Sequence, residues 1–424
     1  MKLRRLTFSQ LSEQSGSSIS LDSPTLQRTQ TIIDRVRQDR DTALYDYARE
    51  FNEIGLADQE PLSITRQQLE SSLDRVDPNI RGTLERTAQR IESFAMRQLA
   101  AFQSLDCDID GGYAGHRLIP ISNVGCYVPG GRYPLVSTAL MTAVTARVAG
   151  CQNVSLATPK PNETMLAAAA IANVDRVLRI GGAHVIAAMA CGTQTIEPVD
   201  LIVGPGNRWV TAAKKLVAGN VGIDMLAGPT ELVVLADHSA SPEKIAADLL
   251  AQAEHDEDAR PILVSTDERL VSEVEAQLER QLSSLKTEDI ARKSLATNGF
   301  VVLCSSLAEA IAVCNRLAPE HLELMCADAE TVSNQIENAG CLFYGEHAAE
   351  VFGDYGVGPN HTLPTARSAR FSAGLNVMNF IRIRSYVQMT RQPSREFIDD
   401  VARLAEIEGL DGHRAACELR RDRR

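Results

Sequence analysis

The pattern of apolar and polar residues changes character at about residue 117. Before it, apolar residues recur at helical spacing in segments 23–47 and 78–102, each beginning at or beside a proline, which favours the first helical turn. After it, short apolar runs of strand length alternate with helical segments. The strand-like runs are residues 118–121, 124–128, 154–157, 177–180, 201–203, 232–235, 262–264, 300–303 and 342–344. The helical segments are residues 136–148, 167–172, 183–190, 208–217, 242–255, 267–285 and 307–317.

Repeated strand–helix units predict mostly parallel sheets with helices on both faces. The units form two series that separate near residues 222–230, and the last segment, 375–424, is helical apart from a strand pattern over 380–387. We therefore predict an α/β fold with two Rossmann-like parallel-sheet domains plus a small helical N-/C-terminal extension. The expected division is a discontinuous domain of residues 20–125 and 231–375, a domain of residues 126–230, and an extension of residues 1–19 and 376–424.

Composition and charge narrow the class of protein. The chain has 424 residues, 44% of them hydrophobic, and a net charge of -12, so it can bury a substantial core and lacks the basic character of a nucleic-acid-binding domain. Its nine cysteines form no C-x-x-C pair, which indicates free thiols in a reducing compartment. No signal peptide is evident, and no apolar run approaches the ~18 residues of a membrane span. We expect a soluble cytoplasmic protein that binds neither membranes nor nucleic acid.

Three glycine-rich turns each follow a predicted strand and precede a predicted helix. They are Pro129-Gly130-Gly131, Gly181-Gly182-Ala183 and Gly204-Pro205-Gly206-Asn207. Such turns can present backbone N–H groups to a phosphate, although tight-turn geometry alone explains any one of them. Because the carboxyl ends of parallel strands share one edge of a sheet, three together favour a nucleotide crevice.

The pair Glu320-His321 is the strongest candidate for acid–base chemistry. It follows Pro319, which ends the preceding helical segment, and we expect the pair to start a new helical turn with the two side chains about 100° apart. Two titratable groups on different faces can serve two proton transfers at one carbon. The alternative is a solvated helix start, with Glu320 near the positive end of the helix dipole.

A second group of polar residues could hold a metal ion. Gln252 and His255 are spaced i,i+3 and are expected on one helix face. Together with Asp354 and His413 they would form a mixed N/O set suited to Zn²⁺ with open positions for substrate. Spacing alone leaves surface or capping roles for these residues open.

Taken in order, the motifs resemble those of the histidinol dehydrogenase family over nearly the whole chain. The matching blocks are Tyr127-Val128-Pro129-Gly130-Gly131, Gly204-Pro205-Gly206-Asn207, Gln252-Ala253-Glu254-His255, Ala318-Pro319-Glu320-His321-Leu322-Glu323, Gly353-Asp354-Tyr355 with Asn360-His361-Thr362-Leu363-Pro364-Thr365, and Glu408-Gly409-Leu410-Asp411-Gly412-His413. The resemblance implies a zinc-dependent, NAD-linked homodimer. Such an enzyme oxidises L-histidinol to L-histidine through L-histidinal, in the last steps of histidine biosynthesis.

The resemblance also implies roles for residues. Zinc ligands would be Gln252, His255, Asp354 and, from the partner subunit, His413. Glu320 and His321 would be the acid–base pair, with His321 taking the hydroxyl proton and Glu320 activating water. Substrate would contact Thr230, His361, Glu408, His321 and the zinc ligands, with Thr230 in place of the usual Ser. NAD would contact Tyr127, Asn207 and the turn that carries His184. Residues 126–230 would bind NAD, residues 20–125 with 231–375 would be catalytic, and the extension would serve the dimer and the partner's active site.

Departures from the family pattern leave the substrate open. His184 stands where Gln is usual, and residues 130–135 and 195–200 resemble the sulfopropanediol dehydrogenase branch. The alternatives are a related dehydrogenase that oxidises another polar alcohol, such as sulfopropanediol, and a zinc-binding paralogue without turnover.

Overall fold

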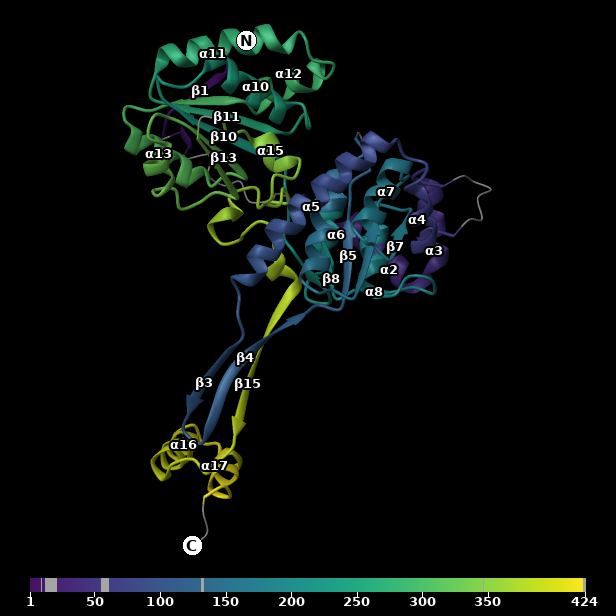
Figure 1. Cartoon of the computed structure of the whole chain (residues 1–424), viewed down its shortest axis with the longest axis vertical. Helices are drawn as coiled ribbons and strands as arrows, with labels where there is room; N and C mark the ends of the chain where they lie inside the picture. The colour runs from purple at the N-terminus through teal and green to yellow at the C-terminus, as the bar shows by residue number, and fades with distance from the viewer. Residues whose placement is uncertain (9, 12–20, 55–60, 131–132, 346, 422–424) are drawn as a thin grey trace.

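The computed structural model describes residues 1–8, 10–11, 21–54, 61–130, 133–345 and 347–421. Two α/β lobes lie next to each other, and a narrow arm extends away from them (Figure 1). The predicted fold class, with two parallel-sheet units and a terminal extension, is confirmed. Gly131 and Arg132, which belong to two of the motif stretches, lie outside the described residues. Within the described part of the chain, no helix is both long enough and apolar enough to cross a membrane.

The first lobe contains a six-stranded sheet with the order β2-β7-β6-β5-β8-β9. Its strands are β2 (Ser63–Thr65), β5 (Asn123–Tyr127), β6 (Asn153–Ala157), β7 (Arg176–Leu178), β8 (Leu201–Val203) and β9 (Gly222–Ile223). All pairs are parallel except β2 with β7. The chain moves outward from β5 to β7 and then returns to the other side of β5 at β8, which is the strand order of a dinucleotide-binding sheet.

Helices cover both faces of this sheet and pack apolar residues against it. One face is covered by α4 (Arg66–Ser72), α5 (Pro78–Ala100), α6 (Val136–Val148) and α7 (Glu163–Ile171). The other is covered by α2 (Ser23–Asp39), α3 (Asp41–Glu50), α8 (Gly182–Cys191) and α9 (Arg208–Val217). The helices of residues 23–100 therefore pack on the first lobe, whereas the sequence placed them with residues 231–375. Their apolar faces could not reveal which sheet they would cover.

The second lobe repeats the same six-stranded order, except that its edge strand is parallel to its neighbour. Its sheet runs β1-β12-β11-β10-β13-β14, and all pairs are parallel. The strands are β1 (Arg4–Leu6), β10 (Glu231–Ala236), β11 (Arg260–Ser265), β12 (Phe300–Leu303), β13 (His321–Met325) and β14 (Cys341–Tyr344). The helices are α10 (Pro242–Ala253), α11 (Glu268–Leu282), α12 (Glu288–Thr297), α13 (Leu307–Leu317), α14 (Ala329–Ser333) and α15 (Glu350–Asp354). Residues 1–8 were expected in a terminal arm, but Leu3 and Leu6 are buried here and bring β1 into the sheet.

The arm is built from a three-stranded antiparallel sheet and two helices. Its elements are β3 (Leu105–Ile109), β4 (Gly112–Pro120), β15 (Ile381–Met389), α16 (Arg395–Ile407) and α17 (Asp411–Glu418), preceded by short 3-10 turns at Ser368–Arg370 and Val377–Phe380. The predicted strand 118–121 is the end of β4 and belongs to this sheet rather than to the parallel series. Most residues of β3 and β15 are exposed and most of β4 are half-buried, so these strands do not show the continuous apolar runs of a buried parallel sheet.

Candidate active site

Glu320 and His321 lie at the start of a strand, so the expected helical turn is wrong. Helix α13 ends at Leu317 and is capped by Ala318, which has left-handed backbone angles (φ 44°, ψ 57°). Strand β13 begins at His321 between β10 and β14. The missed signal is the alternation of His321-Leu322-Glu323-Leu324. Leu322 and Leu324 pack into the core below the sheet, and the polar residues between them point to the opposite face.

The Glu320 carboxylate is buried at the amino end of this sheet. Its Oε2 accepts hydrogen bonds from Thr230 Oγ1 at 2.6 Å and from the backbone N of Glu231 at 2.9 Å. Burial raises the pKa of Glu320 well above its ordinary value, although these two hydrogen bonds oppose the shift. Thr230, predicted as a substrate contact, is therefore also the group that orients Glu320.

The His321 imidazole is held as a neutral base. Its Nδ1 lies 3.1 Å from the carbonyl oxygen of Glu231, so Nδ1 carries the proton and donates it. Burial lowers the pKa of His321 to about 4, although the charge of Asp354 opposes the shift. Nε2 is buried, has no hydrogen-bond partner among the residues that the structure describes, and lies 3.8 Å from Asp354 Oδ1. The free lone pair of His321 therefore faces the carboxylate that the motifs predict as a metal ligand.

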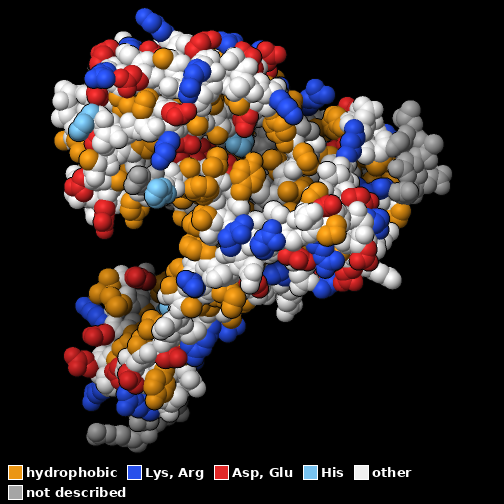
Figure 2. Space-filling model, turned by 45° about the horizontal axis from the view of Figure 1, so that its top comes forward, with side chains coloured by type: hydrophobic (Ala, Val, Ile, Leu, Met, Phe, Trp, Pro, Cys, Tyr) orange, Lys and Arg blue, Asp and Glu red, His pale blue; other side chains and the backbone are white. Residues whose placement is uncertain are grey.

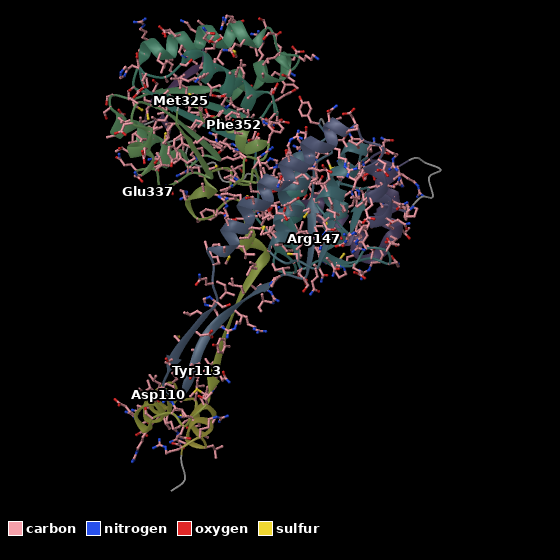
Figure 3. The ribbon with its side chains drawn as sticks, in the orientation of Figure 1. Asp110, Tyr113, Arg147, Met325, Glu337 and Phe352 are labelled. Atoms are coloured by element: carbon pink, nitrogen blue, oxygen red, sulfur yellow. The ribbon has the colours of Figure 1, made fainter. Side chains whose placement is uncertain are left out.

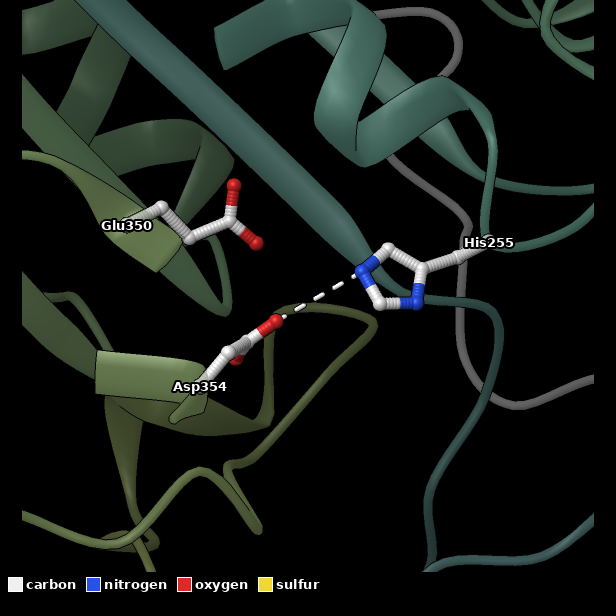
Figure 4. Close-up of side chains that lie close together, drawn as sticks. All are labelled: His255, Glu350 and Asp354. Atoms are coloured by element: carbon white, nitrogen blue, oxygen red, sulfur yellow. Dashed lines mark ion pairs between the residues drawn. The ribbon is translucent and has the colours of Figure 1, made fainter. Parts of the chain in front are cut away.

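Two of the predicted metal ligands meet beside His321. His255 Nε2 lies 3.5 Å from Asp354 Oδ2 (Figure 4). Gln252 is fully buried, and in the described part of the chain neither the oxygen nor the nitrogen of its carboxamide has a hydrogen-bond partner. The expected shared helix face is only partly correct, because α10 ends at Ala253 and His255 lies in the turn that follows.

Glu350 completes this cluster and was missed in the sequence. Ligand atoms of His255, Glu350 and Asp354 lie within 4.8 Å of one another. Burial, followed by the carboxylates of Asp354 and Glu323, raises the pKa of Glu350 well above its ordinary value. A usable signal was present, because Glu350 and Asp354 are spaced i,i+4 and share one face of a helical turn.

His361 joins the cluster to the first lobe. Its Nδ1 lies 2.9 Å from the backbone oxygen of Asp354, and its Nε2 lies 3.0 Å from Thr138 Oγ1 in α6. Burial lowers the pKa of His361, although the Asp354 charge opposes the shift. The structure thus brings His361 and Thr230 to the same region as the acid–base pair.

The remaining two predicted site residues are not brought to this cluster within one chain. Glu408 follows α16, His413 lies in α17, and both are exposed at the end of the arm. The arm carries them away from β13 and α15 (Figure 1).

A cavity of about 630 Å³ opens at the carboxyl ends of the strands of the first lobe and reaches His255. It is lined by Tyr127, His184 and Asn207, the three predicted cofactor contacts. Tyr127 OH accepts a hydrogen bond from the backbone N of Gly182 at 3.2 Å, and burial raises the pKa of Tyr127 to about 12. Asn207 Oδ1 caps α9 through the backbone N of Trp209 at 3.0 Å. The glycine turns after β5, β7 and β8 meet at this cavity, as expected for a parallel sheet.

His184 has a partner that the sequence did not indicate. Its Nε2 lies 2.9 Å from Glu53 Oε2, and Glu53 Oε1 accepts a hydrogen bond from the backbone N of Gly181 at 3.0 Å. A carboxylate therefore occupies the N-terminal end of α8 on the cavity wall. No sequence motif marks Glu53, which lies about 130 residues before its partner.

The glycine of the third turn is required by close packing. Gly204 has φ +110°, and a Cβ there would lie 2.1 Å from the backbone oxygen of Tyr127. Its backbone N donates to Asp224 Oδ2 at 2.7 Å, and Lys214 is paired with Asp224 beneath the turn. The turn is therefore held between the backbone of Tyr127 and the side chain of Asp224.

Comparisons with known proteins agree with the motifs. A family model described as histidinol dehydrogenase matches residues 18–421. The histidinol dehydrogenase of Pseudomonas syringae pv. syringae is 42% identical over 410 residues, which cover 96% of this chain and 91% of that protein. That of Aquifex aeolicus is 41% identical over 391 residues, with 92% and 91% covered. The crystal structure of histidinol dehydrogenase from Elizabethkingia anophelis superposes with a TM-score of 0.92 at 32% identity, covering 99% of this chain and 98% of that one.

Proposed function

The chain belongs to the histidinol dehydrogenase family and is a dehydrogenase, and from this premise we propose that it oxidises L-histidinol to L-histidine through L-histidinal, using NAD and zinc, in histidine biosynthesis. One observation carries the proposal most directly. The unpartnered Nε2 of neutral His321 faces the cluster of Asp354 and His255, which lies at the end of the cavity. A base beside a metal-binding set and a cofactor-sized cavity is an arrangement suited to alcohol oxidation.

The residues of the cluster fit zinc. His255 and Asp354 offer one nitrogen and one carboxylate, and Gln252 offers a buried carboxamide oxygen that lacks any other partner. A zinc ion held there would supply a template for the amine and imidazole nitrogens of the substrate.

The cavity of the first lobe fits a dinucleotide. Its volume of about 630 Å³ lies within the usual range for cofactor sites, and it lies at the strand ends where such cofactors bind. NAD bound there would accept the hydride. We assign NAD binding to residues 126–230, with contacts from Tyr127, Asn207 and His184, and the chemistry to residues 231–375.

The side chains divide the proton transfers. In the first oxidation, the hydroxyl proton moves to Nε2 of His321 while the carbon gives up a hydride. The aldehyde then needs water, and the buried Glu320 carboxylate, a stronger base than an exposed glutamate when ionised, can accept a proton from it. The hydrate then loses a second hydride, and His321 again takes the hydroxyl proton. Two hydrides leave for each molecule of substrate.

We also propose a homodimer with a shared active site. Glu408 and His413 are exposed on an arm that extends away from the cluster of their own chain. Apolar side chains are exposed along this arm, as in Ile383 (57%), Val387 (68%) and Ile407 (68%), and Figure 2 shows hydrophobic surface there. Exchange of arms between two copies would cover this surface and deliver His413 of the partner subunit to the zinc site.

The direct test is the stoichiometry of NADH formation with purified, zinc-loaded protein. We expect two NADH for each L-histidinol consumed, with histidine as product and little free aldehyde. One NADH for each substrate, with aldehyde accumulating, would contradict the four-electron reaction. A panel that includes sulfopropanediol tests the substrate, and a higher kcat/KM for that diol than for histidinol would favour the alternative branch.

A further inference from the structure

Glu350 is a buried carboxyl group with no structural partner. It is the first residue of α15 and is 2% exposed. Within the residues that the structure describes, neither of its side-chain oxygens has a hydrogen-bond partner. Burying a carboxylate without a partner costs free energy, and a cation beside it would offset that cost.

His321 does not supply that cation. Its Nδ1 lies 3.5 Å from Glu350 Oε1, but it lies closer, at 3.1 Å, to the carbonyl oxygen of Glu231. A neutral imidazole has one N–H, and the shorter contact uses it. Glu350 is therefore left without a proton donor on this side.

The open side of Glu350 faces His255 and Asp354. Donor atoms of the three residues lie within 4.8 Å of one another, and Figure 4 shows them converging from α15 and from the turn after α10. Two carboxylates and one imidazole form a mixed N/O set of the kind that zinc accepts. The buried and unpartnered Gln252 carboxamide is an independent indication that a ligand belongs here.

The backbone of α15 holds Glu350 in place for this role. The N–H of Glu350 donates to Glu323 Oε1, a buried carboxylate on β13. The start of the helical turn is thereby fixed, and its i,i+4 spacing puts Glu350 and Asp354 on one face.

We propose that Glu350 is a metal ligand in the substrate-free protein, beside His255 and Asp354. One chain then holds the ion with its own residues before His413 of the partner subunit or the substrate arrives. This inference rests on the proposed metal dependence and adds a residue to it.

The test is metal binding rather than turnover. The full-length, metal-free protein is titrated with Zn²⁺ against a chromophoric chelator, and the Co²⁺ complex is recorded by visible absorption. The variants are Glu350→Gln, with the same shape and no charge, His255→Asn as the positive control, and Glu337→Gln as the matched control. Glu337 is an exposed glutamate of the same lobe (Figure 3). Denaturant unfolding of each metal-free variant checks that the fold is kept.

We expect Glu350→Gln to weaken Zn²⁺ binding by at least ~10-fold and to change the position and intensity of the Co²⁺ bands. Glu350→His, which exchanges an oxygen donor for a nitrogen donor, should restore binding with a further change in the bands. Binding within ~2-fold of the Glu337→Gln control would overturn the proposal. Weaker binding with an unchanged Co²⁺ spectrum would also overturn it, because Glu350 would then act only through another group. If His255→Asn binds metal normally as well, the proposed zinc site itself fails, and the two failures are thereby distinguished.

Discussion

Burial acts in opposite directions on the adjacent side chains of Glu320 and His321. It disfavours the charged form of each, so the pKa of the glutamate rises well above its ordinary value and that of the histidine falls to about 4. The imidazole is therefore neutral near pH 7 and available as a base, and the carboxyl group becomes a stronger proton acceptor once ionised. One physical cause thus shifts the pKa values of two adjacent groups in opposite directions.

This difference predicts that substitutions of the two residues slow different steps of the reaction. His321→Asn should slow the oxidation of both histidinol and histidinal, because each step removes a hydroxyl proton. Glu320→Gln should slow the oxidation of histidinal more than the first hydride transfer, because only the aldehyde needs water. Losses of ~10²–10⁴-fold are the scale for removal of a general base. Single-turnover NADH formation from each substrate measures them, and equal damage to both steps in Glu320→Gln would contradict the division.

Cysteine reactivity offers a prediction with a defined pH dependence. All nine cysteines are free; Cys107 is exposed, whereas burial raises the pKa of Cys126 and Cys151 to about 12 and that of Cys304 to about 11. Thiolates are the reactive form, so a raised pKa keeps these three thiols protonated at pH 8 and their reactivity should increase only at more alkaline pH. A disulfide reagent at pH 8 should modify Cys107 rapidly and these three slowly, with all nine reacting in denaturant. Fast modification of Cys126 in folded protein would contradict the buried environment.

At the level of residues, the sequence revealed groups that lie in recognisable motifs and missed isolated ones. Gln252, His255 and Asp354 are marked by their motifs, and the structure brings His255 and Asp354 to within 3.5 Å. Glu53 and Glu350 are single carboxylates in otherwise ordinary segments. Glu53 contacts His184, and Glu350 lies beside His255. Both partners come from distant parts of the chain, and a hydrophobic pattern carries no information about such pairings; only the i,i+4 spacing of Glu350 and Asp354 was visible in the sequence.

At the level of elements, many of the buried strands and helices were predicted to within a few residues, whereas the buried strand β13 was expected as a helical turn and α12 was not predicted. Examples of agreement are Val136–Val148 and Leu307–Leu317, where helical periodicity and end signals agree. In the arm, the strand pattern over 380–387 correctly predicted β15, but β3 was missed because its residues are mostly exposed, and the end of β4 was placed in the parallel series. Close strand packing rather than apolar alternation marks the arm strands, since a Cβ on Gly112 or Gly115 would lie 1.9 Å from a backbone oxygen of the neighbouring strand.

Close packing at the turn after β8 predicts that a larger residue at position 204 lowers the free energy of unfolding. Gly204→Ala would place a methyl group 2.1 Å from the Tyr127 backbone oxygen, so the turn must shift against β5. We expect a loss of about 1–3 kcal/mol in unfolding free energy and weaker NADH binding, because the cavity is built on this turn. Gly219→Ala is the control, since Gly219 also has positive φ (+96°) but no atom within 4 Å of its added Cβ. Urea unfolding should show the larger loss for Gly204→Ala, and equal losses would assign the effect to backbone angles alone.

At the level of the whole molecule, the proposed site draws on three separate regions. His321 and Asp354 come from the second lobe, Thr138 from the first lobe contacts His361, and His413 lies on the arm. Sequence order cannot show this convergence, because the lobes are interleaved with the arm strands along the chain. Within one chain, the arm holds His413, the last predicted ligand, away from the rest of the site. In a dimer, His413 can join the site only if the arm of each subunit reaches the two lobes of the other subunit.

Arm exchange predicts complementation between two inactive variants. In a heterodimer of His321→Asn and His413→Asn chains, one site combines both substitutions and is inactive. The other site combines intact His321 of the second chain with intact His413 of the first chain. Each heterodimer should therefore retain about half of the wild-type activity, whereas either homodimer has none. Co-expression with two affinity tags isolates the heterodimer, and the NADH assay with histidinol measures its turnover. Heterodimers of His321→Asn with Glu320→Gln chains serve as the control. Both substitutions lie in the second lobe, so each of the two sites carries one of them and neither site should regain activity. Verified His321→Asn/His413→Asn heterodimers without activity would show that each chain builds its site from its own residues, and the arm would then need a different role.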